Sequence, residues 1–314
     1  KYASPPPGPM PEPASAPHGG FRFRKLDKPE EFRSAEQVEA EALGTGGEAP
    51  LGATVQRVIQ DEGGLVLGAF ADIYLAGLTA GFLGWDGTQL YHRTMITAVR
   101  PEYQSHGVAF RLNAFLREEV LRLGLPRIVG TFDPLRSRQA HLVLRRLGAR
   151  PERYLTHYFG RLDSAADRGL ETDRLRVRWD LTDPSVEGRI AGRLPPSEED
   201  RARWAASMSI VDTEISEEGL RRPVAVGEPA GASAHLEIPF DLDAIQEHAP
   251  GLLRPWRHAV RDGFRAAFDL GYQVDDFAVL NLEHERRGFY LLRPAGPAPA
   301  DGATAPAPPP VPSG

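Results

Sequence analysis

The residues between Met95 and Gly148 hold the clearest chemical pattern in the chain. An apolar strand leads into a loop with a glycine, Gly107, and the loop opens directly into a long helix. At such a junction unpaired backbone N–H groups point toward one place, and the helix dipole adds partial positive charge there. A glycine lets a ligand approach the backbone closely. The pattern predicts a phosphate site built from main-chain atoms, although the same arrangement is often an ordinary turn.

Polar side chains after the following strand could act on a substrate. Asp133 follows that strand directly, and Arg136 and Arg138 come next, where they could hold a carboxylate through paired hydrogen bonds. Tyr154 and Tyr158 are four residues apart in a predicted strand over 154–159, so they should share one face of it. We take Asp133, Tyr154 and Tyr158 as candidates for catalysis and the two arginines as candidates for substrate binding.

Each candidate also has an ordinary structural interpretation. Asp133 can cap the turn that follows it, the tyrosines can pack on a sheet, and the arginines can be solvated. His92 and Arg93 are interpreted as polar residues at the edge of a strand. A group of acidic residues in the second half matches no familiar metal site and is interpreted as a solvated face, so no metal is predicted. The group comprises Asp241, Asp243, Asp275, Asp276, Glu283 and Glu285.

Composition limits the class of protein. The chain has 314 residues, and two Pro-rich tails, 1–20 and 294–314, hold 15 of its 29 prolines. The 273 residues between them are enough for a large core. With 41% hydrophobic and 25% charged residues, the chain is globular rather than coiled-coil, collagenous or wholly disordered. The absence of cysteine excludes a thiol nucleophile and disulfides. The net charge of -6 argues against broad nucleic-acid binding.

Nothing in the sequence predicts a membrane partner. Residues 1–20 lack the apolar core of a signal peptide. Residues 63–85 are long enough to cross a membrane, but Asp72 divides them into two strand-length pieces. We therefore predict two paired strands there and a cytoplasmic protein, with the two tails disordered.

Hydrophobic spacing predicts two structured blocks, about 21–181 and 182–293. Helices are predicted over 29–43, 53–60, 108–123, 137–147, 198–208 and 252–270. Strands are predicted over 21–26, 65–70, 73–83, 90–99, 127–132, 154–159, 175–179, 223–226, 235–239, 274–282 and 288–292. Because the second block also has a helix followed by two strands, a degenerate internal duplication is one interpretation of it.

The loop sequence itself is distinctive. It reads Gln104, Ser105, His106, Gly107, Val108 and Ala109. This resembles the Arg/Gln-x-x-Gly-x-Gly/Ala loop of the Gcn5-related N-acetyltransferase (GNAT) superfamily, and the order of elements fits over about 21–181. The resemblance implies an α+β fold with a central mixed, mostly antiparallel sheet flanked by helices. It also implies that an acyl-CoA pyrophosphate rests on the N–H groups of these six residues, with the pantetheine arm along the strand around Thr97 and Val99.

Further residues are similar to one branch of that superfamily and extend the resemblance to about residue 293. They are 131–135, Ala140, His141, 146–149, Tyr154, Tyr158, Gly160, 172–174, Trp179, Ile238, Pro239, Trp256, Arg257, Arg261, Phe264, Gly271, Tyr272 and 290–292. Some members of this branch are associated with N-acylation of amino acids, notably N-succinylation beside N-acylamino-acid racemases.

Two positions depart from the superfamily pattern. Counted back from Gly148, Leu144 stands where the superfamily usually has the tyrosine that protonates the leaving thiolate, and Ser137 stands where it usually has asparagine. Either Tyr154 or Tyr158 replaces that acid, or the thiolate leaves unassisted, which a thiol pKa of ~8.5 allows.

The resemblance thus implies an acyl-CoA-dependent N-acyltransferase that moves an acetyl or succinyl group to a small amine such as an amino acid. Acetyl-CoA or succinyl-CoA would be the co-substrate. The alternative, favoured by Leu144 and Ser137, is a non-catalytic CoA-binding or structural module. A third interpretation is a partner-binding protein that uses its tails. The C-terminal block would complete the acceptor pocket or form the interface of a homodimer.

Overall fold

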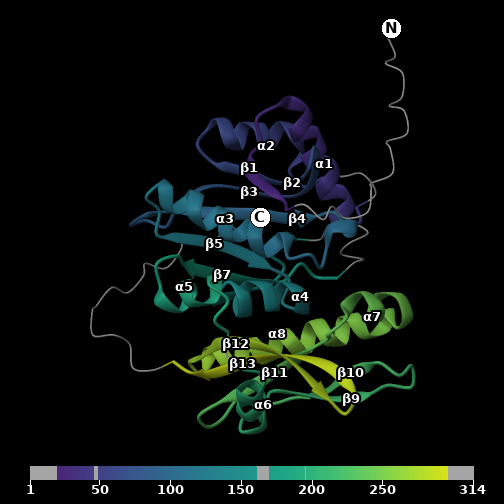
Figure 1. Cartoon of the computed structure of the whole chain (residues 1–314). Coiled ribbons are helices and arrows are strands. Elements are labelled where there is room, and N and C mark those ends of the chain that lie inside the picture. Colours follow the sequence, from purple (N-terminus) through teal and green to yellow (C-terminus); the bar gives the residue numbers. More distant parts are fainter. Residues whose placement is uncertain (1–19, 46–48, 161–169, 195, 296–314) are drawn as a thin grey trace. The chain divides into compact units, whose positions relative to one another are not determined.

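The computed structural model describes residues 20–45, 49–160, 170–194 and 196–295. Within these residues the strands form a seven-stranded sheet, a four-stranded sheet and a two-stranded sheet, accompanied by helices (Figure 1). The predicted α+β fold with a mixed sheet is therefore confirmed, and the C-terminal block has a separate sheet. The tails predicted at 1–20 and 294–314 lie almost entirely outside the described residues.

The seven-stranded sheet has the order β1-β2-β3-β4-β5-β7-β6. Its strands are β1 (Arg22–Lys25), β2 (Leu65–Ala71), β3 (Tyr74–Trp85), β4 (Leu90–Val99), β5 (Arg127–Phe132), β6 (Arg150–Leu155) and β7 (Arg174–Asp180). Strands β4 and β5 run parallel, whereas β7 is antiparallel to both β5 and β6. The segment 63–85 forms the neighbouring strands β2 and β3, as predicted. No helix in the described part of the chain combines the length and apolar character needed to cross a membrane.

Helices connect these strands in the predicted order. They are α1 (Pro29–Leu43), α2 (Gly52–Asp61), the 3-10 turn η1 (Pro101–Tyr103), α3 (Val108–Arg122), α4 (Ser137–Ala140) and the π-helical turn η2 (His141–Arg146). The helix predicted over 137–147 is therefore α-helical only in its first turn. Of the remaining predicted residues, His141–Arg146 form the π-helical turn.

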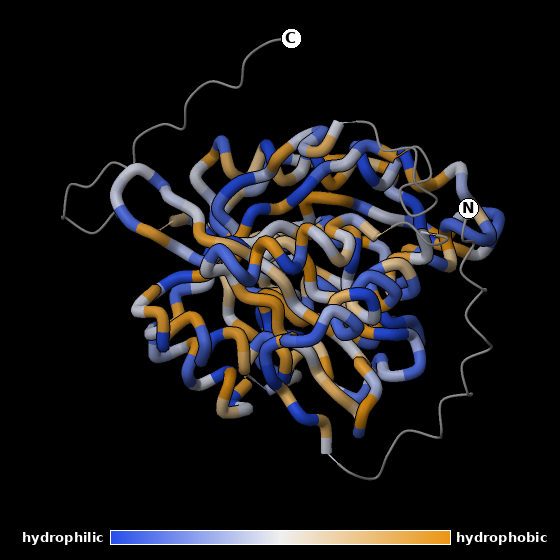
Figure 2. Tube along the Cα trace, turned by 90° about the horizontal axis from the view of Figure 1, so that it is seen from above, coloured by the Kyte–Doolittle hydropathy of each residue, from blue (hydrophilic) through white to orange (hydrophobic). Residues whose placement is uncertain are grey.

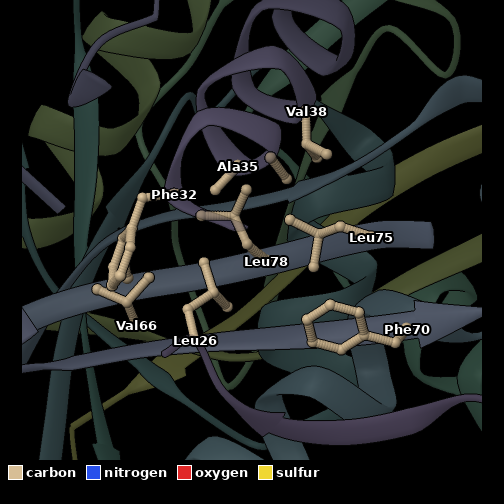
Figure 3. Packing of buried hydrophobic residues seen from close by; sticks show 10 residues of the cluster. Leu26, Phe32, Ala35, Val38, Val66, Phe70, Leu75 and Leu78 are labelled. Carbon is tan, nitrogen blue, oxygen red and sulfur yellow. The ribbon is translucent and has the colours of Figure 1, made fainter. Parts of the chain in front are cut away.

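The chain divides into two compact units, Lys1–Ala80 with Ile96–Phe115, and Gly81–Met95 with Leu116–Gly314. In the first unit, helix α1 begins at Pro29 and ends before Gly44, whose positive φ of 62° closes the helix. Its apolar stripe packs on strands β2 and β3 (Figure 3). The cluster includes Leu26, Phe32, Ala35, Val38, Val66, Phe70, Leu75 and Leu78. This packing supports the strand end from which the predicted phosphate loop starts.

In the second unit, the C-terminal block forms the four-stranded sheet, of order β12-β13-β11-β8, and a β9–β10 hairpin. Its elements are α5 (Pro184–Ile190), α6 (Ser197–Ala205), β8 (Met208–Ser209), β9 (Val211–Ile215), β10 (Arg221–Val226), β11 (Ala234–Ile238), α7 (Leu242–His248), the 3-10 turn η3 (Pro250–Leu252), α8 (Leu253–Asp269), β12 (Tyr272–Leu282) and β13 (Glu285–Pro294). Helix α8 buries Trp256, Val260 and Phe264 completely, as its spacing predicted. The mixture of hydrophilic and hydrophobic residues along the helices is visible in Figure 2.

We expect Gly81→Ala to destabilise the protein by about 1–3 kcal/mol, because a β-carbon there would overlap the Arg93 carbonyl oxygen and lie 2.6 Å from His92 Nε2. Gly130→Ala is the matched control: it also sits in a strand, but the nearest atom to its β-carbon would be Val177 Cγ2 at 3.8 Å. Urea unfolding followed by circular dichroism measures both. Equal losses in the two variants would contradict the close packing of β3 on β4.

Candidate functional site

The predicted site residues divide between the two units. Thr97, Val99 and the loop from Gln104 to Ala109 belong to the first. The second contains Asp133, Arg136, Arg138, Tyr154 and Tyr158. Each set has its own local geometry.

The loop between β4 and α3 has the backbone geometry of an anion site. Ser105 and Gly107 both have positive φ, 66° and 71°. Gly107 is exposed, and a β-carbon on it would meet open space. The Arg111 N–H bonds back to the Gly107 carbonyl oxygen at 3.1 Å, so the N–H groups of the preceding residues lie at the N-terminal end of the 15-residue helix α3. Successive N–H groups around left-handed residues form a concave site for an anion.

Side chains hold this loop in shape. Gln104 Nε2 donates to the Val99 carbonyl oxygen at 3.1 Å. The His106 ring lies 2.8 Å, through Nδ1, from the Gln104 carbonyl oxygen. Arg111 donates to the His106 carbonyl oxygen at 3.1 Å. Gln104 and His106 thus contact the backbone of the loop itself, and main-chain N–H groups are the part of the loop suited to a ligand.

The two predicted residues on β4 are tied to the core of the first unit. Val99 is buried in a cluster with Val108 and Leu112, so a ligand would reach it only through its backbone. The Thr97 hydroxyl lies 3.0 Å from the Thr79 hydroxyl. Thr79 in turn donates to the Ile96 carbonyl oxygen at 3.0 Å. These bonds fix the end of β4.

Asp133 lies directly after β5, as predicted, and its carboxylate is held by Arg257 of α8. Two hydrogen bonds of 2.8 Å join the guanidinium to both carboxylate oxygens, and the Leu135 N–H donates to Oδ1 at 2.9 Å. Burial by itself would raise the pKa of Asp133, but the charge and hydrogen bonds of Arg257 outweigh it and hold that pKa below its usual value. A carboxylate whose pKa is lowered in this way is a weak base. Its hydrogen bonds to Arg257 fix the position of the chain at the end of β5.

Tyr154 belongs to a second buried ion pair. Its hydroxyl donates to Asp173 at 2.7 Å. Asp173 also accepts two hydrogen bonds from Arg261, at 2.8 and 3.0 Å, and one from the His157 N–H at 3.1 Å. Burial raises the pKa of Tyr154, and the negative charge of Asp173 raises it further. Tyr154 therefore stays protonated, with its hydrogen directed at Asp173.

The prediction that Tyr154 and Tyr158 share one face of a strand is wrong. Strand β6 ends at Leu155, and His157 has a positive φ of 50°. A hydrogen bond ties this turn to the segment before β7: the Tyr158 N–H donates to the Thr172 carbonyl oxygen at 3.1 Å. Tyr158 is 42% exposed and packs against the Phe159 ring. The two tyrosines are thus in different environments, one locked to a carboxylate and one open to solvent.

The predicted substrate arginines and the two departures lie around α4. Arg136 forms an ion pair with Asp243, and Arg138 is exposed. The Ser137 hydroxyl donates to the Phe240 carbonyl oxygen at 2.5 Å, and the Leu144 side chain is buried. Ser137 therefore joins α4 to the C-terminal block, and Leu144 is a buried residue of η2.

His92 and Arg93 are not edge residues, contrary to the prediction. They pair with Ile128 and Val129 of β5, inside the sheet, and both are buried. Neither ring nitrogen of His92 has a hydrogen-bond partner among the described residues. Burial lowers the pKa of His92 to about 4, so it is neutral at pH 7. The sequence did not reveal this burial, because two polar residues in an apolar strand are also typical of a strand at the edge of a sheet. The order of the strands places them inside.

Asp276, predicted on a solvated face, is also buried, at 1% exposure. It accepts hydrogen bonds from Arg145 at 2.7 Å and from Arg189 at 3.2 Å. Arg145 bonds Asp200 as well. The acidic residues were visible in the sequence, but their arginine partners lie far away along the chain. No group of three or more acidic or histidine side chains in the described ranges could hold a metal ion.

No protein-family model matches the chain, and no curated protein matches its sequence. Solved structures do match. They include the acetyltransferase of the GNAT family from Streptococcus pneumoniae, at 14% identity over 50% of this chain and 98% of that chain, with a TM-score of 0.42. The ribosomal-protein-S18-alanine N-acetyltransferase from Escherichia coli matches at 16% identity over 51% of this chain and 94% of that chain, with a TM-score of 0.42. A chain of the NatC complex bound to Gag peptide and CoA matches at 16% identity over 52% and 100%, with a TM-score of 0.42. About half of the present chain has no counterpart in these three chains.

We expect Asp133→Asn and Arg257→Met each to lower the free energy of unfolding by about 3–5 kcal/mol, because each leaves the other group buried without its partner. The double variant should lose clearly less than the sum of the two. Chemical denaturation of the four proteins gives this coupling. The exposed pair Arg57 and Asp61 is the control, with an expected effect of about 0.5 kcal/mol. Additive losses at Asp133 and Arg257 would contradict a direct ion pair.

We expect stability to fall as the pH drops from about 6.5 to about 4, because unfolded His92 takes up a proton that the folded protein excludes. With a folded pKa of about 4, this one group accounts for ~2 kcal/mol between pH 7 and pH 5. His92→Leu removes the titrating group, so its unfolding free energy should depend less steeply on pH. Denaturant unfolding at a series of pH values tests this. The same slope in both proteins would show that His92 is not buried neutral.

Proposed function

We propose that the protein is an acyl-CoA-dependent N-acyltransferase that moves an acetyl or succinyl group to a small amine such as an amino acid. The observation that carries the proposal is the loop between β4 and α3. There, Ser105 and Gly107 have positive φ immediately before the N-terminus of a long helix. This geometry favours a diphosphate held by main-chain N–H groups.

The residues of the loop fit such a group. Ser105, His106 and Gly107 are exposed, and Gly107 leaves open space beside the backbone. Val108 is buried at the start of α3 and fixes the direction of the helix. A diphosphate at this position would be stabilised by the helix dipole. When bound, acyl-CoA supplies an activated acyl group as a thioester.

The transfer needs few protein groups. The amine nitrogen forms a bond to the thioester carbonyl carbon, the carbon–sulfur bond breaks, and the thiolate takes a proton while the ammonium proton passes to water. Tyr158 is exposed and is the better candidate for the proton donor, because the Tyr154 hydroxyl donates to Asp173. Asp133, held by Arg257, acts as a positioning residue for the end of β5.

A second function has specific support: a CoA-binding module without catalysis. Leu144 cannot donate a proton, the Ser137 hydroxyl is engaged with Phe240, and Tyr154 is locked to Asp173. With these three side chains, the phosphate loop would be intact but the usual donor of a proton to the leaving thiolate would be missing. The two functions differ in one measurable property, the release of free CoA from acyl-CoA in the presence of an amine.

Gly107→Asp should weaken the binding of CoA at least about tenfold, because it places a negative charge beside the bound diphosphate. Gly107→Asn is the matched control. Both side chains tolerate the positive φ at this position, and they differ only in charge. Isothermal titration of the full chain with CoA gives the affinities. We expect the asparagine variant to bind CoA at least about tenfold more tightly than the aspartate variant, because the two side chains have similar size and differ in charge.

Wild-type protein that is folded but does not bind CoA would overturn both functions. Binding that both variants retain equally would place the diphosphate elsewhere. Where CoA binds, thiol release from acetyl-CoA and succinyl-CoA with a panel of the twenty amino acids separates the two functions. Release that depends on an amine supports the transferase, and binding without release supports the non-catalytic module.

A further inference from the structure

In the described part of the second unit, one buried cation, Arg93, has no carboxylate among its hydrogen-bond partners. Arg93 of β4 is only 8% exposed. Its Nη2 donates to the Thr131 hydroxyl at 3.2 Å. Its Nη1 is buried and has no hydrogen-bond partner in the described part of the chain. Buried guanidinium groups are normally paired with a carboxylate, because an unpaired charge in the interior destabilises the fold.

The charged groups near Arg93 make its lack of a carboxylate partner more unusual. Burial lowers the pKa of Arg93, and the nearby positive charge of Arg176 of β7 lowers it further. Arg176 has a carboxylate of its own, Glu152, at 3.4 Å. Among the described residues no carboxylate neutralises Arg93, so this neighbourhood is suited to an anionic ligand.

The sheet register places the groups of this site on one face. Thr131 is opposite Arg176 in the β5–β7 ladder, and Arg93 is opposite Val129, two residues before Thr131. Because the Thr131 hydroxyl oxygen accepts from Arg93, its own hydrogen can be donated to a ligand. Thr131 and Arg176 are both partly exposed, so a solute can approach from this face of the sheet.

We propose that Arg93 and Thr131 bind a carboxylate carried by one of the two reactants. The ligand's identity rests on the proposed function: it is the carboxylate of an amino-acid acceptor or the free carboxylate of a succinyl group. Nη1 of Arg93 and the Thr131 hydroxyl would donate to its two oxygens. The arginines predicted for this task differ from Arg93, since Arg136 is paired with Asp243 and Arg138 is exposed.

The test uses the full chain with Arg93→Met and, independently, Thr131→Val. Arg178→Met is the matched control, because Arg178 lies on β7 but is paired with Asp180 at 2.9 Å. Titration calorimetry measures the affinity for CoA, acetyl-CoA and succinyl-CoA. It then measures, at saturating CoA, the affinity for each amino acid and for its amide, which lacks the carboxylate.

Two results support the proposal and identify the source of the carboxylate. If the acyl group carries it, the wild type binds succinyl-CoA at least about tenfold more tightly than acetyl-CoA. If the acceptor carries it, the two acyl-CoAs bind alike and an amino acid binds at least about tenfold more tightly than its amide. In either case Arg93→Met removes the preference and Thr131→Val weakens it. The affinity for CoA stays unchanged, and Arg178→Met behaves as the wild type.

Three results overturn it. One is a wild type that binds CoA but prefers neither carboxylate. Another is a carboxylate preference that survives in both Arg93→Met and Thr131→Val, each folded and binding CoA normally. If the wild type does not bind CoA, the proposed function fails, and titration with succinate alone then decides the site. Binding of succinate that Arg93→Met abolishes supports the carboxylate site, and its absence in the wild type overturns it.

Discussion

Two ion pairs from α8 to the seven-stranded sheet determine much of the second unit. Arg257 holds Asp133 at the end of β5, and Arg261, one helical turn later, holds Asp173 just before β7. Both pairs are bidentate and largely buried, so neither partner can be lost without leaving an uncompensated charge. The Tyr290 hydroxyl donates to the Pro134 carbonyl oxygen at 2.8 Å, next to the first pair. The C-terminal block therefore shapes the end of β5, where transfer chemistry is expected.

This constraint separates side chains that could do chemistry from those that hold the fold. Asp133 and Tyr154 have the right atoms for proton transfer, but both are committed to an arginine or a carboxylate. Tyr158 and Arg93 are not committed in this way. Tyr158 is exposed in a turn, and Arg93 is buried with no carboxylate partner among the described residues. The ion pairs keep the ends of β5 and β7 in position.

A third buried network joins the π turn η2 to the C-terminal block. Arg145 lies between Asp200 and Asp276, and Arg189 approaches Asp276 from α5. Such a network costs desolvation energy, so its value lies in fixing one arrangement of the helices rather than in added stability. Leu144, one of the two departures from the superfamily pattern, lies buried in η2, and the other, Ser137, lies in the preceding α4 and donates to the Phe240 carbonyl oxygen.

The sequence by itself determined the elements and the loop. Apolar spacing placed most helices and strands, including α1, α3 and α8, because periodic burial depends on residues close in the chain. The glycine at 107 and the motif around it pointed to the phosphate loop for the same local reason. Only the tertiary structure decided which charges are buried. Asp133 pairs with Arg257 and Asp276 pairs with Arg145, whereas Arg93 has no carboxylate partner in the part of the chain that the structure describes. The sequence does not reveal this, because ion pairing and burial depend on strand order and on partners more than a hundred residues away.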